Sequence, residues 1–569
     1  MYIESIPNRS SPPAILLREA WREGKKIRKR TVTNLTSWPK EKIESLTRLL
    51  KGDRLVSVTE AFIIERSLPQ GHVEAILKAI SKIGLDRVIS SKRCRERDLV
   101  VGMIAERLIH PCSKLATTRL WHTTTLAEEI GVGDADEDNL YSAMDWLLSR
   151  KDHIERQLAK RHFTEGSVIL YDVTSSYYEG RTCPLACFGH NRDGKEGKPI
   201  IVYGLLADKG GRPVAVDVYP GNTGDPSTVL DQVEKLRKHF GLLRVVLVGD
   251  RGMLTETQID KLRKYPGLGW ISALRSSAIR KLTNSGTLQM SLFDERNLAE
   301  ISSPEFPHER LVACYNPLLA QERRRKREAL VAATSKELEK IKKEVARRTK
   351  KVLGKAEIGK KVGKILNRFK VGKHFELDIQ EGAFSFALKE DAIRRESDLD
   401  GIYVIRTTEP SERMTPEDAV RCYKDLENVE TAFRCMKGVD LLVRPIRHRT
   451  KDHVRAHIFL CMLAYYVEWH MRKALAPLLF EDKELDERRK VSDPVEPKKP
   501  SASAKRKKTL RRTPDGLPVQ SFQTLLAHLS TRCRNRCRIK ADRSGVTFDQ
   551  LTEVTALQKR AFELLDCSQ

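Results

Sequence analysis

Three acidic residues are placed where they could act together on a phosphodiester. Asp172 lies inside the apolar stretch SVILYDVTSSYY (167–178), Asp250 ends the run RVVLVGD (244–250), and Glu430 lies in YKDLENVETAFRCMK. Mg²⁺ and Mn²⁺ prefer carboxylate oxygens, and two such ions can activate an attacking oxygen and stabilise a leaving one. These residue types predict a site for metal-assisted phosphoryl transfer.

Glu430 is flanked by Tyr423 and Lys437, each seven residues away. Residues seven apart in an α-helix return to nearly the same face. Thr415 as N-cap and Gly438 as terminator delimit the expected helix. The three side chains are therefore expected to form one stripe, which on this helix alone could equally be a solvated amphipathic face.

The segments around the acids predict a mixed sheet covered by helices, an α/β layer fold. Expected strands are 167–178, 200–208, one within 207–221, 244–250, 270–275 and 401–408, and expected helices are 227–241 and 255–265. The strands that carry Asp172 and Asp250 can be neighbours in such a sheet. Both carboxylates would then lie at the strand ends, where open α/β sheets bind ligands.

Each acid also has a structural interpretation. Asp172 could pair with an arginine, and Asp250 could begin the turn GDRG. The combination of the two strand positions with the helix of Glu430 favours the metal site over these separate structural roles.

The composition indicates a polyanionic partner. The chain has 569 residues, of which 40% are hydrophobic, and a formal net charge of +27. Neutralising phosphates releases counterions, so this excess favours nucleic acid, although a membrane-surface or ribosomal role would show it too. The N-terminus has no signal-peptide pattern, and the most apolar stretch, IFLCMLAYYV (458–467), is too short to span a bilayer. We expect a cytoplasmic protein without membrane contact.

Changes in pattern along the chain divide it into seven expected regions. They are an N-terminal hairpin and arm (1–55), a helical domain with basic surfaces (56–165), the first part of the α/β core (166–275), an insertion (276–398), the second part of the core (399–481), a basic disordered linker (482–515) and a helical tail (516–569). The linker is expected from its low hydrophobicity and its runs of like charge.

The motifs YDVTSSYYEG, VGDRGML and YKDLENVETAFRCMKGVDLLVRPIRHR together resemble the DDE insertion-sequence transposases of the insertion-sequence-four group and its close relatives. This resemblance implies a ribonuclease-H-like mixed sheet with helices on both faces, a largely helical insertion and an all-α N-terminal DNA-binding region. It also implies that Asp172, Asp250 and Glu430 are a catalytic triad that binds two Mg²⁺ or Mn²⁺ ions. Tyr423 and Lys437 correspond to residues that contact phosphates of the transposon end.

One position departs from the family pattern. The signature arginine falls on Leu426, which cannot hold a phosphate, and Arg434 on an adjoining stripe is the expected substitute. The segment RPIRHRTK (444–451) is expected to contact the DNA backbone through Arg447 and Arg449.

The resemblance implies cut-and-paste transposition, in which water nicks the end of the element and the freed terminal hydroxyl then joins to a target. The partners would be double-stranded DNA, both terminal inverted repeats and target, with a homodimer assembled on paired ends. Two alternatives stay open: a ribonuclease-H-like nuclease or resolvase that cuts without joining, and a catalytically idle DNA-binding protein descended from a transposase.

Overall fold

The structure is a computed structural model, and it describes residues 1–9, 11–53, 61–348, 350–540 and 546–566. The chain divides into two compact units. The smaller consists of residues 1–69 and 532–553, and the larger of residues 70–531 and 554–569. The expected boundary between residues 55 and 56 lies outside the described residues.

Among its described residues, the smaller unit contains two three-stranded antiparallel sheets and one helix. Its elements are β1 (Tyr2–Ile6), β2 (Ala14–Glu23), β3 (Lys26–Asn34), α1 (Lys40–Leu50), β4 (Phe62–Pro69), β15 (Cys533–Ile539) and β16 (Thr547–Leu551). One sheet has the order β1-β2-β3 and the other β16-β15-β4. Gly24 has a φ of 59° in the turn between β2 and β3, which confirms the expected hairpin.

The expectation of an all-α N-terminal region is wrong, because β1 to β4 precede the first helix of the larger unit. The expected helical tail is likewise interrupted, since β15 pairs with β4 and with β16. The physical reason is that β4 and β15 satisfy each other's backbone groups across most of the chain. That long-range pairing leaves no local signal in the sequence.

The larger unit begins with a helical region. Its elements are α2 (Gly71–Lys82), α3 (Leu85–Ile89), α4 (Arg95–Ile109), α5 (Lys114–Leu120), η2 (Trp121–Thr123), α6 (Leu126–Ile130), α7 (Glu137–Ser149) and α8 (Lys151–His162). Asp136 caps α7 by accepting a hydrogen bond from the Asn139 amide. The apolar faces of these helices, Trp121 included, join the main hydrophobic core.

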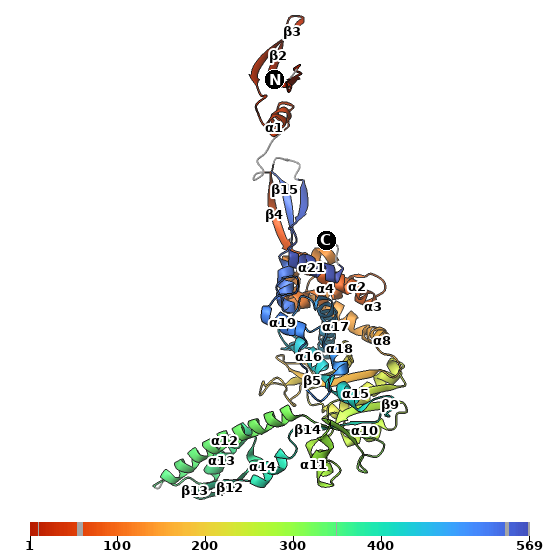
Figure 1. Cartoon of the computed structure of the whole chain (residues 1–569), viewed down its shortest axis with the longest axis vertical. Helices are drawn as coiled ribbons and strands as arrows, with labels where there is room; N and C mark the ends of the chain where they lie inside the picture. Colours follow the sequence, from red (N-terminus) through yellow and green to blue (C-terminus); the bar gives the residue numbers. More distant parts are fainter. Residues whose placement is uncertain (10, 54–60, 349, 541–545, 567–569) are drawn as a thin grey trace. The chain divides into compact units, whose positions relative to one another are not determined.

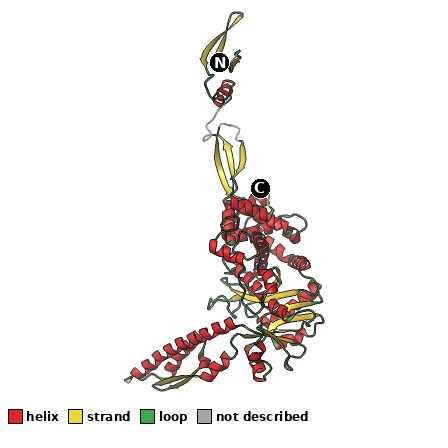
Figure 2. Cartoon of the chain, in the orientation of Figure 1, coloured by secondary structure: helices red, strands yellow, loops and turns green. Residues whose placement is uncertain are grey.

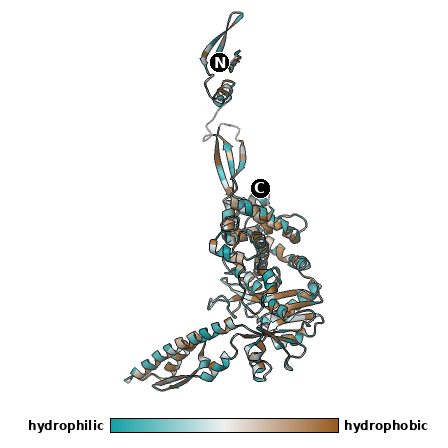
Figure 3. Ribbon diagram, viewed as in Figure 1, coloured by the Kyte–Doolittle hydropathy of each residue, from teal (hydrophilic) through white to brown (hydrophobic). Residues whose placement is uncertain are grey.

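An eight-stranded mixed sheet forms the centre of the larger unit. Its strands are β5 (Val168–Tyr177), β6 (Ile200–Asp208), β7 (Pro213–Pro220), β8 (Val245–Val248), β9 (Leu268–Ala273), β10 (Leu298–Ile301), β11 (Arg310–Tyr315) and β14 (Ile402–Thr407). They lie in the order β10-β11-β14-β9-β8-β5-β6-β7. β8 runs parallel to both β5 and β9, whereas the other neighbours are antiparallel. The strands are largely hydrophobic, as expected for a buried sheet (Figure 3).

Helices pack against this sheet, as Figure 2 shows. They are η3 (Asp225–Thr228), α9 (Val229–Glu234), η4 (Lys235–His239), α10 (Glu256–Leu262), α15 (Pro416–Lys424), α16 (Leu426–Lys437) and α17 (Lys451–Leu475). α16 packs on β5, α15 on β9, and α17 on β7. Among the described residues, no helix combines the length and apolarity needed to cross a membrane.

Between β9 and β14 the chain adds further helices and a hairpin. They are α11 (Ser276–Asn284), η5 (Met290–Phe293), α12 (Pro317–Arg347), α13 (Lys355–Phe369), η6 (Gly372–His374), β12 (Phe375–Gln380), β13 (Ala383–Leu388) and α14 (Glu390–Ser397). α11 and η5 pack with β11 and β14 in one apolar cluster. α12, α13 and the β12–β13 hairpin lie side by side around their own apolar cluster (Figure 1). β10 and β11, which fall inside the expected insertion at 276–398, instead pair into the central sheet.

The prediction that residues 482–515 form a disordered linker is wrong. The segment contains α18 (Leu485–Val491) and α19 (Ala502–Leu510), and α20 (Phe522–Ser530) and α21 (Ala556–Leu565) follow it. Its basic side chains find acceptors on the core: Arg489 pairs with Asp425 at 2.6 Å. The Lys507 ammonium donates to the carbonyl oxygen of Ala476 at 2.9 Å. These contacts offset the charge that made the segment look disordered.

Candidate active site

Asp172 and Asp250 extend from neighbouring strands. In the parallel pair of β5 and β8, Leu170 lies opposite Val248. Asp172 comes two residues after Leu170, and Asp250 comes two residues after Val248. The register therefore places both aspartates at one edge of the β5–β8 pair, as expected for neighbouring strands.

The environment of Asp172 links the three acids. Burial is the largest cause of a pKa of about 7 for the Asp172 carboxyl; a hydrogen bond from the Val173 amide and the charge of Arg192 oppose the rise, and the negative charges of Asp250 and Glu430 add to it. That amide donates to Asp172 Oδ1 at 2.8 Å. The charges of Asp250 and Glu430 thus reach the Asp172 carboxyl where β5 ends its pairing with β8, and a divalent cation is the natural counter-charge for such a group.

Glu430 is carried by α16, which packs on β5. The expected helix from Thr415 to Gly438 is present in two pieces, α15 and α16, with Asp425 between them. The Thr415 side chain accepts a hydrogen bond from the Asp418 amide, as expected for the N-cap. Val429 and Phe433 are buried, so the same helix leaves the intervening Glu430 exposed.

The triad suits divalent ions by its donor chemistry. All three members offer hard carboxylate oxygens from three different elements. The three acids do not form a closed cage for one ion. Among the described residues, the group whose candidate ligand atoms all lie within 4.8 Å of one another is a different one, Cys435, Asp440 and Glu468. A site for two ions needs its donors spread more widely than a cage for one, because the ions lie about 3.5–4 Å apart.

The cluster of Cys435, Asp440 and Glu468 is better described as an ion-pair cluster. Arg472 Nε lies 2.6 Å from Glu468 Oε1, and its Nη2 lies 3.5 Å from Asp440 Oδ2. An arginine already supplies the positive charge that a metal would bring, so this cluster is structural.

Tyr423 contacts the second aspartate. Its hydroxyl donates a hydrogen bond of 3.2 Å to Asp250 Oδ1. Burial, with the charge of Asp250, raises the pKa of the Tyr423 phenol above its usual value. The phenol therefore stays protonated and remains a donor beside the triad.

Lys437 lies against the strand of Asp172. Its ammonium donates to Thr174 Oγ1 at 3.0 Å and pairs with Asp193 Oδ1 at 2.8 Å. Asp193 is 1% exposed and also pairs with Arg444. Burial lowers the pKa of Lys437, while the charge of Asp193 opposes that effect. Tyr423, near the C-terminal end of α15, thus reaches Asp250, and Lys437, the last residue of α16, reaches the strand of Asp172.

Sequence reasoning missed Asp193, Thr174 and Arg444. Asp193 lies in the polar segment GHNRDGKEGK between β5 and β6, where no periodicity distinguishes one charged residue from another. Arg444 falls inside the expected backbone-contact segment, but its pairing with a buried aspartate left no trace in the sequence.

The remaining expected contacts lie at the surface or in the core. Leu426 is 8% exposed and belongs to the hydrophobic core, which explains why this position needs no charge. Arg434 is exposed, and among the described residues its side chain makes no ion pair. Arg447 is exposed and pairs with Glu179 at 3.1 Å. Arg449 is exposed, and its carbonyl accepts a hydrogen bond from Thr182.

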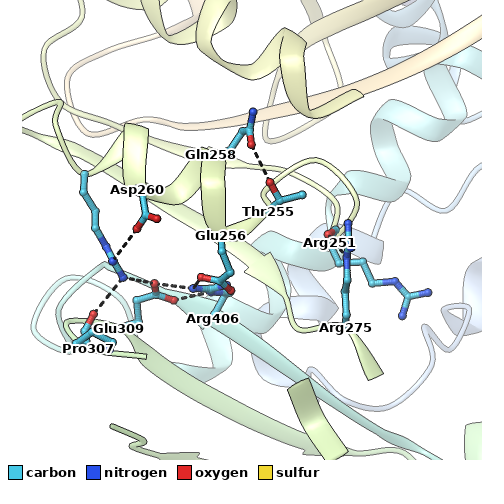
Figure 4. A network of polar contacts seen from close by, with 10 residues as sticks. Arg251, Thr255, Glu256, Gln258, Asp260, Arg275, Pro307, Glu309 and Arg406 are labelled. Carbon is cyan, nitrogen blue, oxygen red and sulfur yellow. Dashed lines mark hydrogen bonds and ion pairs between the residues drawn. The ribbon is translucent and has the colours of Figure 1, made fainter. Parts of the chain in front are cut away.

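A buried ion-pair network fixes the loop after Asp250 (Figure 4). Arg406 on β14 pairs with Glu309 at 2.5 Å and with Glu256, the first residue of α10, at 2.6 Å. Arg275 Nε donates to the carbonyl oxygen of Arg251 at 3.4 Å. These contacts tie both ends of the segment that follows Asp250 to the sheet.

Comparison with protein families agrees with this geometry. Residues 165–467, more than half of the chain, match the family described as Transposase DDE domain. The match spans the strands of both aspartates and the helix of Glu430. The chain therefore belongs to the transposase DDE-domain family: it is a transposase, an enzyme that cuts and joins DNA.

A second family match, at the N-terminus, identifies the kind of transposase more closely. Residues 3–57 match the family described as IS1634 family transposase, N-terminal domain. The protein is thus a DDE insertion-sequence transposase with an N-terminal domain of the IS1634 type. No curated protein matches the chain.

Among solved structures, the chain aligns with a cryo-EM structure of the piggyBac transposase synaptic complex with hairpin DNA. The TM-score is 0.35 with 10% identity, over 81% of this chain and 76% of that chain. That degree of likeness supports no conclusion about this chain.

Proposed function

We propose that Asp172, Asp250 and Glu430 are the catalytic triad of cut-and-paste transposition and hold two Mg²⁺ or Mn²⁺ ions. The observation that carries this proposal is the adjacency of the two aspartates on β5 and β8, with the charge of Glu430 acting on the Asp172 carboxyl. Bound ions would activate the attacking oxygen and stabilise the leaving oxygen of the phosphodiester.

The core is of the ribonuclease-H-like type. Three antiparallel strands, β7, β6 and β5, are followed by β8 and β9, which run parallel to β5. This strand order supports that assignment, with β14, β11 and β10 extending the far edge. Asp172 then lies on the first strand of the sheet in sequence order, Asp250 lies two residues after the end of the fourth, and the glutamate lies on a later helix.

The side chains around the triad position the DNA end. Tyr423 holds Asp250 through its hydroxyl, which fixes the carboxylate relative to α15. Lys437 presents a positive charge beside Thr174 and can exchange its contact with Asp193 for a phosphate oxygen. Arg434, Arg447 and Arg449 are exposed and would add backbone contacts.

The reaction needs no energy source beyond the DNA bonds themselves. Water attacks the phosphodiester at the element's end, one P–O bond forms, and the terminal 3′ oxygen leaves as a hydroxyl. That hydroxyl then attacks a target phosphodiester, so one bond forms for each bond broken. One active site serves one end, and two protomers would assemble on a pair of ends.

The test uses DNA that carries the inverted repeats flanking the coding region. The purified full chain is incubated with paired ends and a target plasmid, with Mg²⁺ or with excess chelator. We expect excised and joined products with the ion and none with the chelator. Cutting without any joined product would instead identify a nuclease, and binding without cutting would identify an idle DNA-binding protein.

A further inference from the structure

A cavity of about 280 Å³ lies between the helical region and the segment that follows α16. Its polar lining includes Arg107, Lys114, Tyr141, Arg444, Arg447 and His448. The cavity is much larger than the space of about 30 Å³ that one water occupies. A group of several heavy atoms fits it.

Two of the lining cations are buried without a counter-charge. Arg107 is 6% exposed and Lys114 is 3% exposed. In the part of the chain that the structure describes, neither side chain has an ion pair or a hydrogen bond. Glu106, the acid next to Arg107 on α4, directs its Oε1 to His110 at 3.1 Å. Burying an unpaired charge is strongly unfavourable, so two together demand an explanation.

The other two cations that line the cavity do have counter-charges. Arg444 pairs with Asp193, and Arg447 pairs with Glu179 at 3.1 Å. Among the cations that line the cavity, the unpaired ones are therefore Arg107 and Lys114. Burial, together with the charge of Arg107, lowers the pKa of Lys114 to about 7. An anion in the cavity would remove this penalty.

The cavity adjoins the active site through a short series of contacts. Arg444 lines the cavity and pairs with Asp193, and Asp193 pairs with Lys437. Lys437 in turn donates to Thr174, two residues after Asp172 on β5. A DNA strand held at Lys437 can therefore continue past Arg444 to the cavity.

We propose that Arg107 and Lys114 bind a phosphate group of a DNA strand that passes the active site. The DNA partner in this inference rests on the proposed function, whereas the phosphate chemistry rests on the two unpaired cations. The rings of Tyr141 and His448 meet edge to face, with centroids 6.0 Å apart, at the wall of the cavity. They offer an apolar surface to the sugar attached to that phosphate.

Lys114→Met tests the proposal, with Lys507→Met as the matched control. Lys507 is also buried, at 9% exposed. Its ammonium, however, donates to the carbonyl oxygens of Ala476, Leu479 and Glu481 at 2.9, 3.3 and 3.2 Å. Met keeps the length of either side chain and removes the charge. Lys114→Met is expected to raise the Tm, while Lys507→Met lowers it because three acceptors lose their donor.

The probes are inorganic phosphate and a duplex with the element's end sequence. Phosphate at constant ionic strength should raise the Tm of the wild type and of Lys507→Met, but not of Lys114→Met. Lys114→Met should bind the duplex about tenfold more weakly, and the slope of log affinity against log salt should fall by about 1. An unchanged salt slope would overturn the assignment to DNA, even if the phosphate effect on the Tm were lost.

A second measurement needs no variant. Acylation of lysines in the wild-type chain at neutral pH, read by mass spectrometry, should label Lys114 in the free protein and leave it protected by the duplex. Equal labelling with and without DNA would contradict the proposal. The Asp172→Asn variant should show the same protection, because failure of the triad stops cleavage without emptying the cavity.

Discussion

The Tyr423 hydroxyl donates a hydrogen bond of 3.2 Å to Asp250 Oδ1, which connects α15 to the end of β8. One side chain of the sequence stripe thereby holds the carboxylate of another element in place. In the proposed mechanism this contact would act on the rate through the position of Asp250, since the phenol itself is uncharged.

Removing this hydroxyl should slow cleavage without unfolding the protein. Tyr423→Phe loses one hydrogen bond, so we expect a rate of DNA-end cleavage about three- to tenfold lower and a nearly unchanged Tm. Single-turnover cleavage measures the effect. Tyr315→Phe is the control, because among the described residues the Tyr315 hydroxyl makes no hydrogen bond. An equal loss of rate in both variants would rule out a specific role for the Asp250 contact.

Asp193 is the counter-charge of Lys437 and Arg444, and it is 1% exposed. Asp193→Asn should lower the free energy of unfolding by about 2 kcal/mol, because both charge-assisted contacts weaken. It should also tighten DNA binding severalfold, since a negative charge beside the strand is lost and Lys437 is released. Denaturant unfolding and a salt titration of binding measure the two effects.

The control for Asp193 is Asp260→Asn. Asp260 is 68% exposed and pairs with Arg263 at the surface. Its substitution should change neither quantity appreciably. Weaker DNA binding by Asp193→Asn would show that the aspartate holds Lys437 in its working position.

The Arg406 network should contribute to stability and not to the chemistry. Arg406 is 3% exposed and Glu309 is 0% exposed. Arg406→Met leaves the Glu309 carboxylate buried with a single partner, Arg263, so the free energy of unfolding should fall by about 3 kcal/mol. Thermal and denaturant unfolding measure this loss. Arg263→Met, at a position 35% exposed, should cost clearly less. Equal losses of unfolding free energy in the two variants would mean that burial does not determine how much each arginine contributes to stability.

Lys114 should make stability depend on pH. Its pKa is lowered from the ordinary value to about 7. The charged or titratable groups that face it are Arg107, Cys112 and Cys461, with His448 and His457 across the cavity. Between pH 7 and the unfolded pKa, the unfolded chain binds the proton that the folded chain releases, so stability rises with pH. Lys114→Met should therefore gain a few degrees of Tm at pH 6 and much less at pH 9. A gain independent of pH would contradict a buried charge.

The strands and helices of the core could be predicted because their signals are local. The expected strand at 200–208 coincides with β6, and the apolar run at 244–250 contains β8. The prediction that Asp172 and Asp250 lie close together followed from the order of these elements. The helix of Glu430 was predicted from its cap and period, although the break at Asp425 was not.

What could not be predicted depends on partners far away in the chain. β4 becomes a strand by pairing with β15, and the segment at 482–515 is ordered by acceptors such as Asp425 and the carbonyl oxygen of Ala476. Asp193 and the cavity of Arg107 and Lys114 likewise arise only when distant segments meet. The composition shows that such segments are charged, but it does not show which residues neutralise that charge.

The central claim is that three carboxylates act together at one site. Its most direct measurement is cleavage of end DNA in Mg²⁺ by Asp172→Asn, Asp250→Asn and Glu430→Gln, beside Glu427→Gln as the matched control. Glu427 lies on the same helix as Glu430, is 57% exposed and pairs with Lys498. We predict that each triad variant binds the DNA but cleaves about a thousandfold more slowly or not at all, while Glu427→Gln cleaves like the wild type. Cleavage near the wild-type rate by any one of the three variants would contradict the claim.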